Sequence, residues 1–307
     1  MKRAHAKKNF DALDSVRESK DAQKAKKGAR QIPESKNALE SKSAPKSLKL
    51  GIFDSGVGGL SVAKSVLESR IFSEVVYYGD TARVPYGVKD AQTIIRFSLE
   101  ALDFFKEQRV DMLIVACNTA SAYALDALKN SAPFPVIGVV EPGVLARINA
   151  CKNKESTTLI LGTKATITSG VYQHLLKEAG FSRLCAVPTG LLVPIVEEGL
   201  YKSHSGAKIL RASLEHYLAP FLRCIELDNR APDTIILGCT HFPFIAKEIG
   251  EFFGEKSILI HSGDAIVEYL ESTHALQTSR FGQTSIEFFA SSDVEGLKAR
   301  AALWLEM

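Results

Sequence analysis

Short apolar runs alternate with amphipathic stretches from about residue 48 to the end of the chain. The apolar runs end in glycine, serine, threonine or asparagine, which is typical of buried strands that lead into loops. Stretches with apolar positions every three to four residues separate them and predict helices. Strands are predicted at 48–53, 75–78, 111–116, 136–140, 157–161, 185–187, 234–237, 257–260 and 286–290. Helices are predicted at 60–69, 90–108, 121–130, 169–179, 207–221, 245–253, 264–271 and 294–304, with a polar turn at 162–168 and a turn or short helix at 193–199.

This alternation predicts largely parallel sheets covered by helices on both faces. The order of elements restarts near residue 157, and each half contains a turn with Ser or Thr and a strand that ends in cysteine. We therefore expect an α/β fold of two pseudo-symmetric lobes with mostly parallel sheets. The active site should lie in the cleft between the lobes. Lobe one is predicted to be 49–140 with 265–307, and lobe two to be 141–264.

Residues 1–48 differ from the rest of the chain in composition and charge. They contain 13 Lys and Arg against 6 Asp and Glu, whereas the other 259 residues contain 25 against 29. With few large apolar residues, such a segment cannot bury enough surface to offset its ordering entropy. We expect a basic, disordered N-terminal extension that stays solvated. An arm that binds protein or nucleic acid is the interpretation that we do not favour.

The remaining composition indicates an ordinary globular protein. The chain is 46% hydrophobic and 24% charged, and no apolar stretch approaches the length of a membrane span. The basic N-terminus lacks the apolar core of a secretory signal. The five cysteines are an odd number without a CxxC motif near the reactive-looking ones, so we expect free thiols and a cytoplasmic protein.

Two cysteines stand at matching places in the two halves. Cys117 ends the run MLIVAC at 112–117 and Cys239 ends TIILGC at 234–239. Each is followed by polar residues, Asn118 and Thr119 in one case and Thr240 and His241 in the other. A thiol at the carboxyl end of a strand, before a helix, is where α/β folds build ligand sites and favour thiolate. The matching positions predict a pair of thiols that face one substrate.

The sequence gives less support for a functional role of the other cysteines, or for a metal site. Cys151, Cys185 and Cys224 have no comparable polar neighbours, and we take them as structural. Cys239 with His241 could begin a metal site, but no zinc-type spacing supplies further ligands, so we predict no metal.

Two glycine-containing loops also follow predicted strands. The turn DSGVGG at 54–59 fits neither GxGxxG nor GxxxxGK[ST], so a substrate-contacting turn, a plain tight turn and a nucleotide site all stay open. The loop at 79–87 is stiffened by Pro85, and Tyr86 within it could cap a ligand or simply pack. Glu197 and Glu198 follow an apolar stretch. Both side chains are solvated in the ordinary interpretation, and in the alternative one of them faces the cleft.

Together, these segments resemble the glutamate racemase family, within the aspartate/glutamate racemase superfamily. The resemblance runs in order through seven segments between about 50 and 270: GIFDSGVGG (51–59), YGDT (78–81), PYG (85–87), ACNTA (116–120), GTKAT (162–166), VPIVEEG (193–199) and LGCTHFP (237–243). The chain departs from the family pattern in its long N-terminal extension and in an expanded stretch around 222–232.

The resemblance implies a cofactor-independent, two-base racemisation of L- and D-glutamate that supplies D-glutamate for peptidoglycan, in a homodimer. It implies that Cys239 deprotonates L-glutamate and Cys117 deprotonates D-glutamate, with help from Asp54, His241 and Glu197. The residues that it implies for substrate binding are Asp54, Ser55, Pro85, Tyr86, Gly87, Asn118, Thr119, Thr163, Thr166, Thr240 and His241.

The residue types suit this chemistry. Inversion at Cα needs one ionised and one protonated group on opposite faces, and the pKa of a thiol, about 8.5 when unperturbed, allows both states. A Schiff base of pyridoxal phosphate on Lys164 is the chemical alternative, but we expect Lys164 to point to solvent and predict no cofactor. Two further alternatives are a racemase of aspartate or another acidic amino acid, and a partner-binding protein that acts through its basic tail.

Overall fold

The computed structural model of the chain describes residues 47–224 and 231–306. The predicted N-terminal extension lies outside the described residues except for its last two positions. Much of the stretch around 222–232 lies outside them as well.

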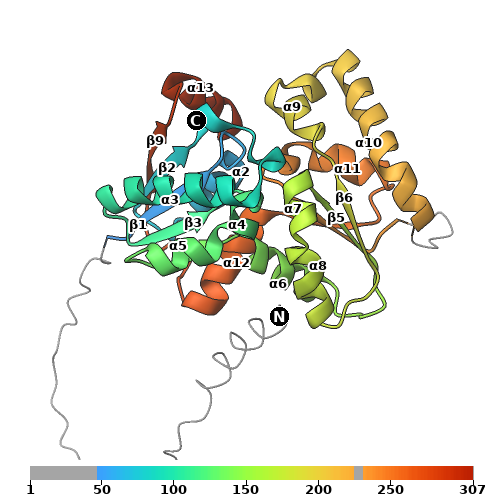
Figure 1. The fold of residues 1–307 in the computed structure, drawn as a ribbon, viewed down its shortest axis with the longest axis horizontal. Helices are drawn as coiled ribbons and strands as arrows, with labels where there is room; N and C mark the ends of the chain where they lie inside the picture. Colours follow the sequence, from blue (N-terminus) through green and yellow to red (C-terminus); the bar gives the residue numbers. More distant parts are fainter. Residues whose placement is uncertain (1–46, 225–230, 307) are drawn as a thin grey trace, which may run out of the picture. The chain divides into compact units, whose positions relative to one another are not determined.

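The first sheet contains five strands, all parallel to their neighbours (Figure 1). Its order is β4-β3-β1-β2-β9, so the last strand of the chain pairs with β2 at one edge. The strands are β1 (Lys49–Asp54), β2 (Glu74–Gly79), β3 (Met112–Val115), β4 (Val136–Gly138) and β9 (Ser285–Ala290).

The second sheet contains four strands, again all parallel, in the order β6-β5-β7-β8. Its strands are β5 (Thr158–Gly162), β6 (Leu184–Pro188), β7 (Thr234–Gly238) and β8 (Ile258–Ile260). Two parallel sheets with intervening helices confirm the predicted α/β fold. The limits of the two predicted lobes stay a prediction.

Helices lie on both faces of each sheet (Figure 1). Side chains of α3, α4 and α5 pack on one face of the first sheet, and those of α6 and α8 pack on one face of the second. A third apolar cluster joins the other two faces through α2, α9, α10, α11, α12 and α13. The helices are α2 (Leu60–Ser69), α3 (Ala91–Glu107), α4 (Asn118–Tyr123), α5 (Leu125–Ser131), α6 (Val140–Ala150), α7 (Lys164–Ser169), α8 (Val171–Glu178), α9 (Leu192–Glu197), α10 (His204–Cys224), α11 (Ala246–Phe252), α12 (Ser262–His274) and α13 (Val294–Trp304).

Three local predictions were wrong. The polar turn predicted at 162–168 contains helix α7, because the Thr163 side chain accepts a hydrogen bond from the Thr166 amide and caps it. The helix predicted at 121–130 begins earlier, directly after Cys117, and is divided into α4 and α5 at Ala124.

The third error is α6, which begins where the sequence predicts the end of a strand. Its first turn contains Glu141, Pro142 and Gly143. Proline is tolerated there because backbone N–H groups in the first turn have no carbonyl acceptor within the helix, so the missing N–H of proline costs no helical hydrogen bond. The helix packs against α8, α12 and β7, so it lacks the single apolar face that reveals a helix in sequence. Within the described residues, no helix is both long and apolar enough to span a bilayer.

The buried centre of the second sheet should carry much of the stability of the fold. Ile160 in β5 is fully buried, whereas Ile258 in the edge strand β8 is 47% exposed. We expect Ile160→Ala to lower the free energy of unfolding by about 2–5 kcal/mol, because it removes buried methyl groups and leaves a cavity. Ile258→Ala is the matched control and should cost less than about 1 kcal/mol. Chemical denaturation of both variants measures the difference, and equal losses would contradict this description of the core.

Candidate active site

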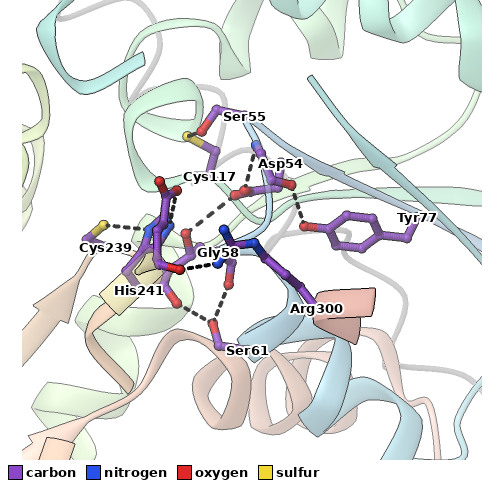
Figure 2. A network of polar contacts seen from close by, with 12 residues as sticks. Asp54, Ser55, Gly58, Ser61, Tyr77, Cys117, Cys239, His241 and Arg300 are labelled. Atoms are coloured by element: carbon purple, nitrogen blue, oxygen red, sulfur yellow. Dashed lines mark hydrogen bonds and ion pairs between the residues drawn. The ribbon is translucent and has the colours of Figure 1, made fainter. Parts of the chain in front are cut away.

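The two cysteines predicted as a pair lie in one pocket. Cys117 follows β3 and Cys239 follows β7, so each is at the carboxyl end of a strand of a different sheet. The thiols are 5% and 6% exposed, and both line a pocket that holds about 440 Å³ of space free of atoms, including solvent at its mouth. Figure 2 shows both sulfur atoms at one side of a connected network of polar groups.

Cys117 lies in a buried environment that favours the neutral thiol. Its Sγ accepts a hydrogen bond from the amide of Ala120 in the first turn of α4 and is 3.4 Å from Ser55 Oγ. Burial, and after it the nearby carboxyl group of Asp54, raise the pKa of Cys117 to about 12, although the hydrogen bonds with Ser55 and Ala120 act to lower it.

Cys239 has a different partner, an imidazole. Its Sγ is 3.6 Å from His241 Nδ1, and His241 Nε2 is 2.8 Å from Glu197 Oε1. Burial alone would lower the pKa of His241, but the contacts with Cys239 and Glu197 outweigh it and raise the pKa to about 10. His241 is therefore a cation near neutral pH, held between a sulfur and a carboxylate.

Glu197, at the end of α9, is the last member of this series of contacts from Cys239 through His241. Burial would raise the pKa of Glu197, but the hydrogen bond and charge of His241, together with Arg300, hold it below the ordinary value. Arg300 in α13 also donates a hydrogen bond to the backbone oxygen of Glu197 (Figure 2). A cation at the carboxyl end of a helix stabilises its free carbonyl groups.

The glycine-rich turn after β1 brings the two halves of this network together. A Cβ at Gly58 would collide with Thr240 Oγ1 and with the His241 ring, so only glycine allows the turn to approach so closely. Ser61, in the first turn of α2, donates to the backbone oxygens of Thr240 at 2.7 Å and Gly58 at 3.0 Å.

Asp54 lies beneath this turn and is fully buried. Its Oδ2 accepts from the Gly56 amide at 2.9 Å, and Thr240 Oγ1 donates to its Oδ1 at 3.5 Å. Burial raises the pKa of Asp54, although the charge of His241 partly opposes this. Asp54 therefore connects the turn that carries Ser55 with the loop that carries Cys239.

Hydroxyl and amide groups form another wall of the pocket. The hydroxyls of Thr119, Thr163 and Thr166 lie 2.9–3.0 Å from one another, and Thr119 and Thr163 line the pocket. Asn118 also lines it, and its Oδ1 accepts a hydrogen bond of 2.6 Å from Tyr172. These groups can donate hydrogen bonds to carboxylate oxygens.

Tyr86 packs rather than projecting into solvent. It is 1% exposed, and its hydroxyl donates to Asp80 Oδ2 at 2.6 Å, while Asp80 also pairs with Arg83. The ring still lines the pocket, and the neighbouring Gly87 fits closely against Thr163. The loop at 79–87 therefore forms a braced wall.

Most residues expected at the site line this pocket. Asp54 and Thr166 do not; both are fully buried behind it and contact residues that do. Lys164 and Glu198 are exposed. The residues brought together in the pocket wall are Ser55, Pro85, Tyr86, Gly87, Cys117, Asn118, Thr119, Thr163, Glu197, Cys239, Thr240 and His241.

Sequence reasoning missed four residues of the wall and three that support it. Gly56, Val84, Val193 and Gly238 line the pocket within motifs that the sequence already singled out. Tyr77, Tyr172 and Arg300 lie outside those motifs and reach the site only through the fold. Among the described residues, no cluster of three or more His, Cys, Asp or Glu could hold a metal ion.

The hydrogen bond between Glu197 and His241 predicts a change that NMR can measure. In Glu197→Gln the negative charge is lost while the side-chain shape is kept. We expect the pKa of His241 to fall from about 10 by about 1–3 pH units. Burial disfavours the imidazolium, and the variant lacks the negative charge of Glu197 that helps to offset this effect. Glu198→Gln, at the exposed neighbour, is the control and should leave the titration of the ¹⁵N-labelled imidazole unchanged. A pKa that stays near 10 in Glu197→Gln would contradict this electrostatic description.

The same cation predicts how stability varies with pH. The pKa of His241 in the folded protein, about 10, is above its ordinary value of 6.5, so the native state binds the proton more tightly than the unfolded chain. This contribution is fully present below pH 6.5 and is lost as the pH rises through about 10. Between pH 6.5 and 10, urea denaturation should therefore show a larger loss of stability for the wild type than for His241→Gln. Parallel curves would contradict the prediction.

Comparison with known proteins identifies the family of the chain. Residues 62–270 match the Asp/Glu/Hydantoin racemase family. The chain is 50% identical over 260 residues to a glutamate racemase of Campylobacter jejuni subsp. jejuni, a match that covers 85% of this chain and 99% of the relative. A crystal structure of glutamate racemase from that subspecies has a TM-score of 0.78 and 51% identity, over 85% of this chain and 99% of the other.

A more distant structure was solved with a ligand. The glutamate racemase of Francisella tularensis subsp. tularensis, in complex with D-glutamate, has a TM-score of 0.71 and 28% identity, over 85% of this chain and 94% of the other. The matched sequence and the matched fold show that the chain belongs to the glutamate racemases of the Asp/Glu/Hydantoin racemase family.

Proposed function

We propose that the chain interconverts L- and D-glutamate without a cofactor, with Cys117 and Cys239 as acid and base on opposite faces of Cα. The observation that carries the proposal is a single pocket that holds both thiols in unequal surroundings. The Francisella relative with bound D-glutamate supports the choice of substrate.

The unequal surroundings suggest which thiol starts as the base. The raised pKa of Cys117 keeps it as a neutral thiol near neutral pH. The His241 cation beside Cys239 can balance the charge of a thiolate there. In this state the site is poised for L-glutamate: the Cys239 thiolate removes the α-proton, and the Cys117 thiol gives its proton to the opposite face.

The reverse reaction uses the other protonation state. After one turnover Cys239 carries the proton and Cys117 is the thiolate, so that form of the site accepts D-glutamate. His241 can take up or return a proton at Cys239, and Glu197 keeps the imidazole oriented. Ser55 and the amide of Ala120 stabilise the charge at Cys117 through their contacts with its sulfur.

The pocket must also stabilise the carbanion-like transition state, because the α-proton of an amino acid is a very weak acid. We assign this role to the hydroxyl donors that line the pocket, Thr119, Thr163 and Thr240, acting on the substrate carboxylates. Asp54 and Thr166 act indirectly, because each is buried and holds a lining residue in place.

The setting of the reaction follows from its chemistry. D-Glutamate from this reaction would serve peptidoglycan synthesis, as the family resemblance implies. The mechanism needs reduced cysteines, and Cys117 and Cys239 are free thiols, which supports a reducing compartment such as the cytoplasm. Glutamate racemases provide the precedent for our expectation of a homodimer, which sedimentation analysis would test.

Replacing either thiol should nearly abolish catalysis. We expect Cys117→Ser and Cys239→Ser each to lower kcat by about 10²–10⁴-fold, because a hydroxyl is a far weaker acid than a thiol and a poor base. Circular dichroism can follow the optical activity of glutamate in each direction. Cys151→Ser, outside the pocket, is the control and should retain wild-type rates. Wild-type rates in either pocket variant would exclude the two-thiol mechanism.

The substrate assignment needs its own assay. L-Glutamate, D-glutamate and L-aspartate are incubated with the protein without pyridoxal phosphate, in deuterium oxide. We expect deuterium at Cα of the glutamate product, because the incoming proton comes from a thiol that exchanges with solvent. Faster turnover of L-aspartate would favour the alternative, a racemase of aspartate, and no turnover of any acidic amino acid would exclude both.

A further inference from the structure

Tyr172 in α8 contacts a chain neighbour of each pocket cysteine from outside the pocket. It is 1% exposed, and its hydroxyl donates to Oδ1 of Asn118, the residue after Cys117, at 2.6 Å. Its ring lies against Gly238, the residue before Cys239, where an added Cβ would be 3.4 Å from Cε2. One side chain therefore touches the residue that follows Cys117 and the residue that precedes Cys239.

This contact determines which way the Asn118 amide points. The oxygen and nitrogen of an amide can exchange places by a flip, and only the hydrogen-bond partners decide between the two orientations. With Oδ1 toward Tyr172, Nδ2 lies 3.5 Å from Ser262 Oγ. A flipped amide would donate to the phenol oxygen, and the buried phenol proton would lose the acceptor that Asn118 Oδ1 gives it, which is unfavourable. Burial also raises the pKa of Tyr172, so the phenol keeps the proton that it donates to Asn118.

The orientation has a chemical consequence for the pocket. An amide NH₂ has two hydrogens, and Ser262 can accept only one of them along this contact. Asn118 lines the pocket, so an acceptor of the substrate could take the second hydrogen there. A carboxylate of glutamate is such an acceptor.

We propose that Tyr172 is a positioning residue for the reaction, whose hydroxyl fixes the Asn118 amide with its NH₂ toward a carboxylate of the substrate. The proposal rests on the proposed glutamate racemase function and assigns part of its substrate binding. Tyr172 itself touches neither the reacting atoms nor the pocket.

Tyr172→Phe tests this proposal by removing only the hydroxyl. We expect KM for both enantiomers to rise about tenfold with kcat within about twofold, because the lost contact holds the substrate equally in the ground and transition states. The enantiomers have equal free energy in water, so kcat/KM must fall equally in both directions. Tyr123→Phe is the matched control: the Tyr123 hydroxyl also joins α4 to the α7 region, through Ala165 O at 3.0 Å, but outside the pocket. Its KM should stay within about twofold of the wild type.

A double-mutant cycle separates positioning from general support of the fold. If Tyr172 acts through Asn118, then Tyr172→Phe should raise KM no further in an Asn118→Ala background. Independent, multiplicative effects on KM would overturn the proposal, as would an unchanged KM in Tyr172→Phe.

Asn118→Asp tests the amide orientation without altering Tyr172. If the NH₂ faces the substrate, an aspartate places a negative charge against its carboxylate, and KM should rise more than in Asn118→Ala. A smaller rise than in Asn118→Ala would show that the oxygen faces the pocket and would overturn the proposal. If the wild type itself fails to racemise glutamate, the proposed function falls; if only these variants behave differently from expectation, the role of Tyr172 alone falls.

Discussion

The close approach of the 54–59 turn to the loop after β7 is the contact on which the site depends. Gly58 permits it by lacking a Cβ, and Ser61 secures it with a hydrogen bond to Thr240 O. Parallel sheets place the carboxyl ends of their strands along one edge, so each sheet alone can present only its own thiol. This backbone contact lets Cys117 from one sheet and Cys239 from the other serve the same pocket.

The reaction has equal standard free energies at its two ends, yet the site is electrostatically unequal. The Cys117 side contains a buried carboxyl group, and the Cys239 side contains an imidazolium held by a carboxylate. Thermodynamics allows such an unequal site. The equilibrium constant fixes only the ratio of kcat/KM for L-glutamate to kcat/KM for D-glutamate. In the proposed mechanism, the inequality instead sets which protonation state of the free protein predominates, and therefore which enantiomer it is ready to bind.

The sequence predicted the parts of the site that follow directly from strands. Cys117 and Cys239 were recognisable because each ends an apolar run and precedes polar residues, and the parallel fold then brings such ends together. Arg300 was beyond this reasoning, since its acceptor lies 103 residues away in the chain and only the packing of α13 makes them neighbours. Helix α6 was missed for a different reason: it is packed against several elements and carries no amphipathic pattern.

The position of β9 has a consequence for how the protein is made. Ser285 pairs with Glu74 across more than two hundred residues, so the first sheet stays incomplete until the second has been synthesised. The helix that follows β9 carries the arginine that holds the end of α9. Contacts between such distant segments form slowly, because a long loop must close before they contribute. A nascent chain on the ribosome therefore has both cysteines long before it has a finished active site.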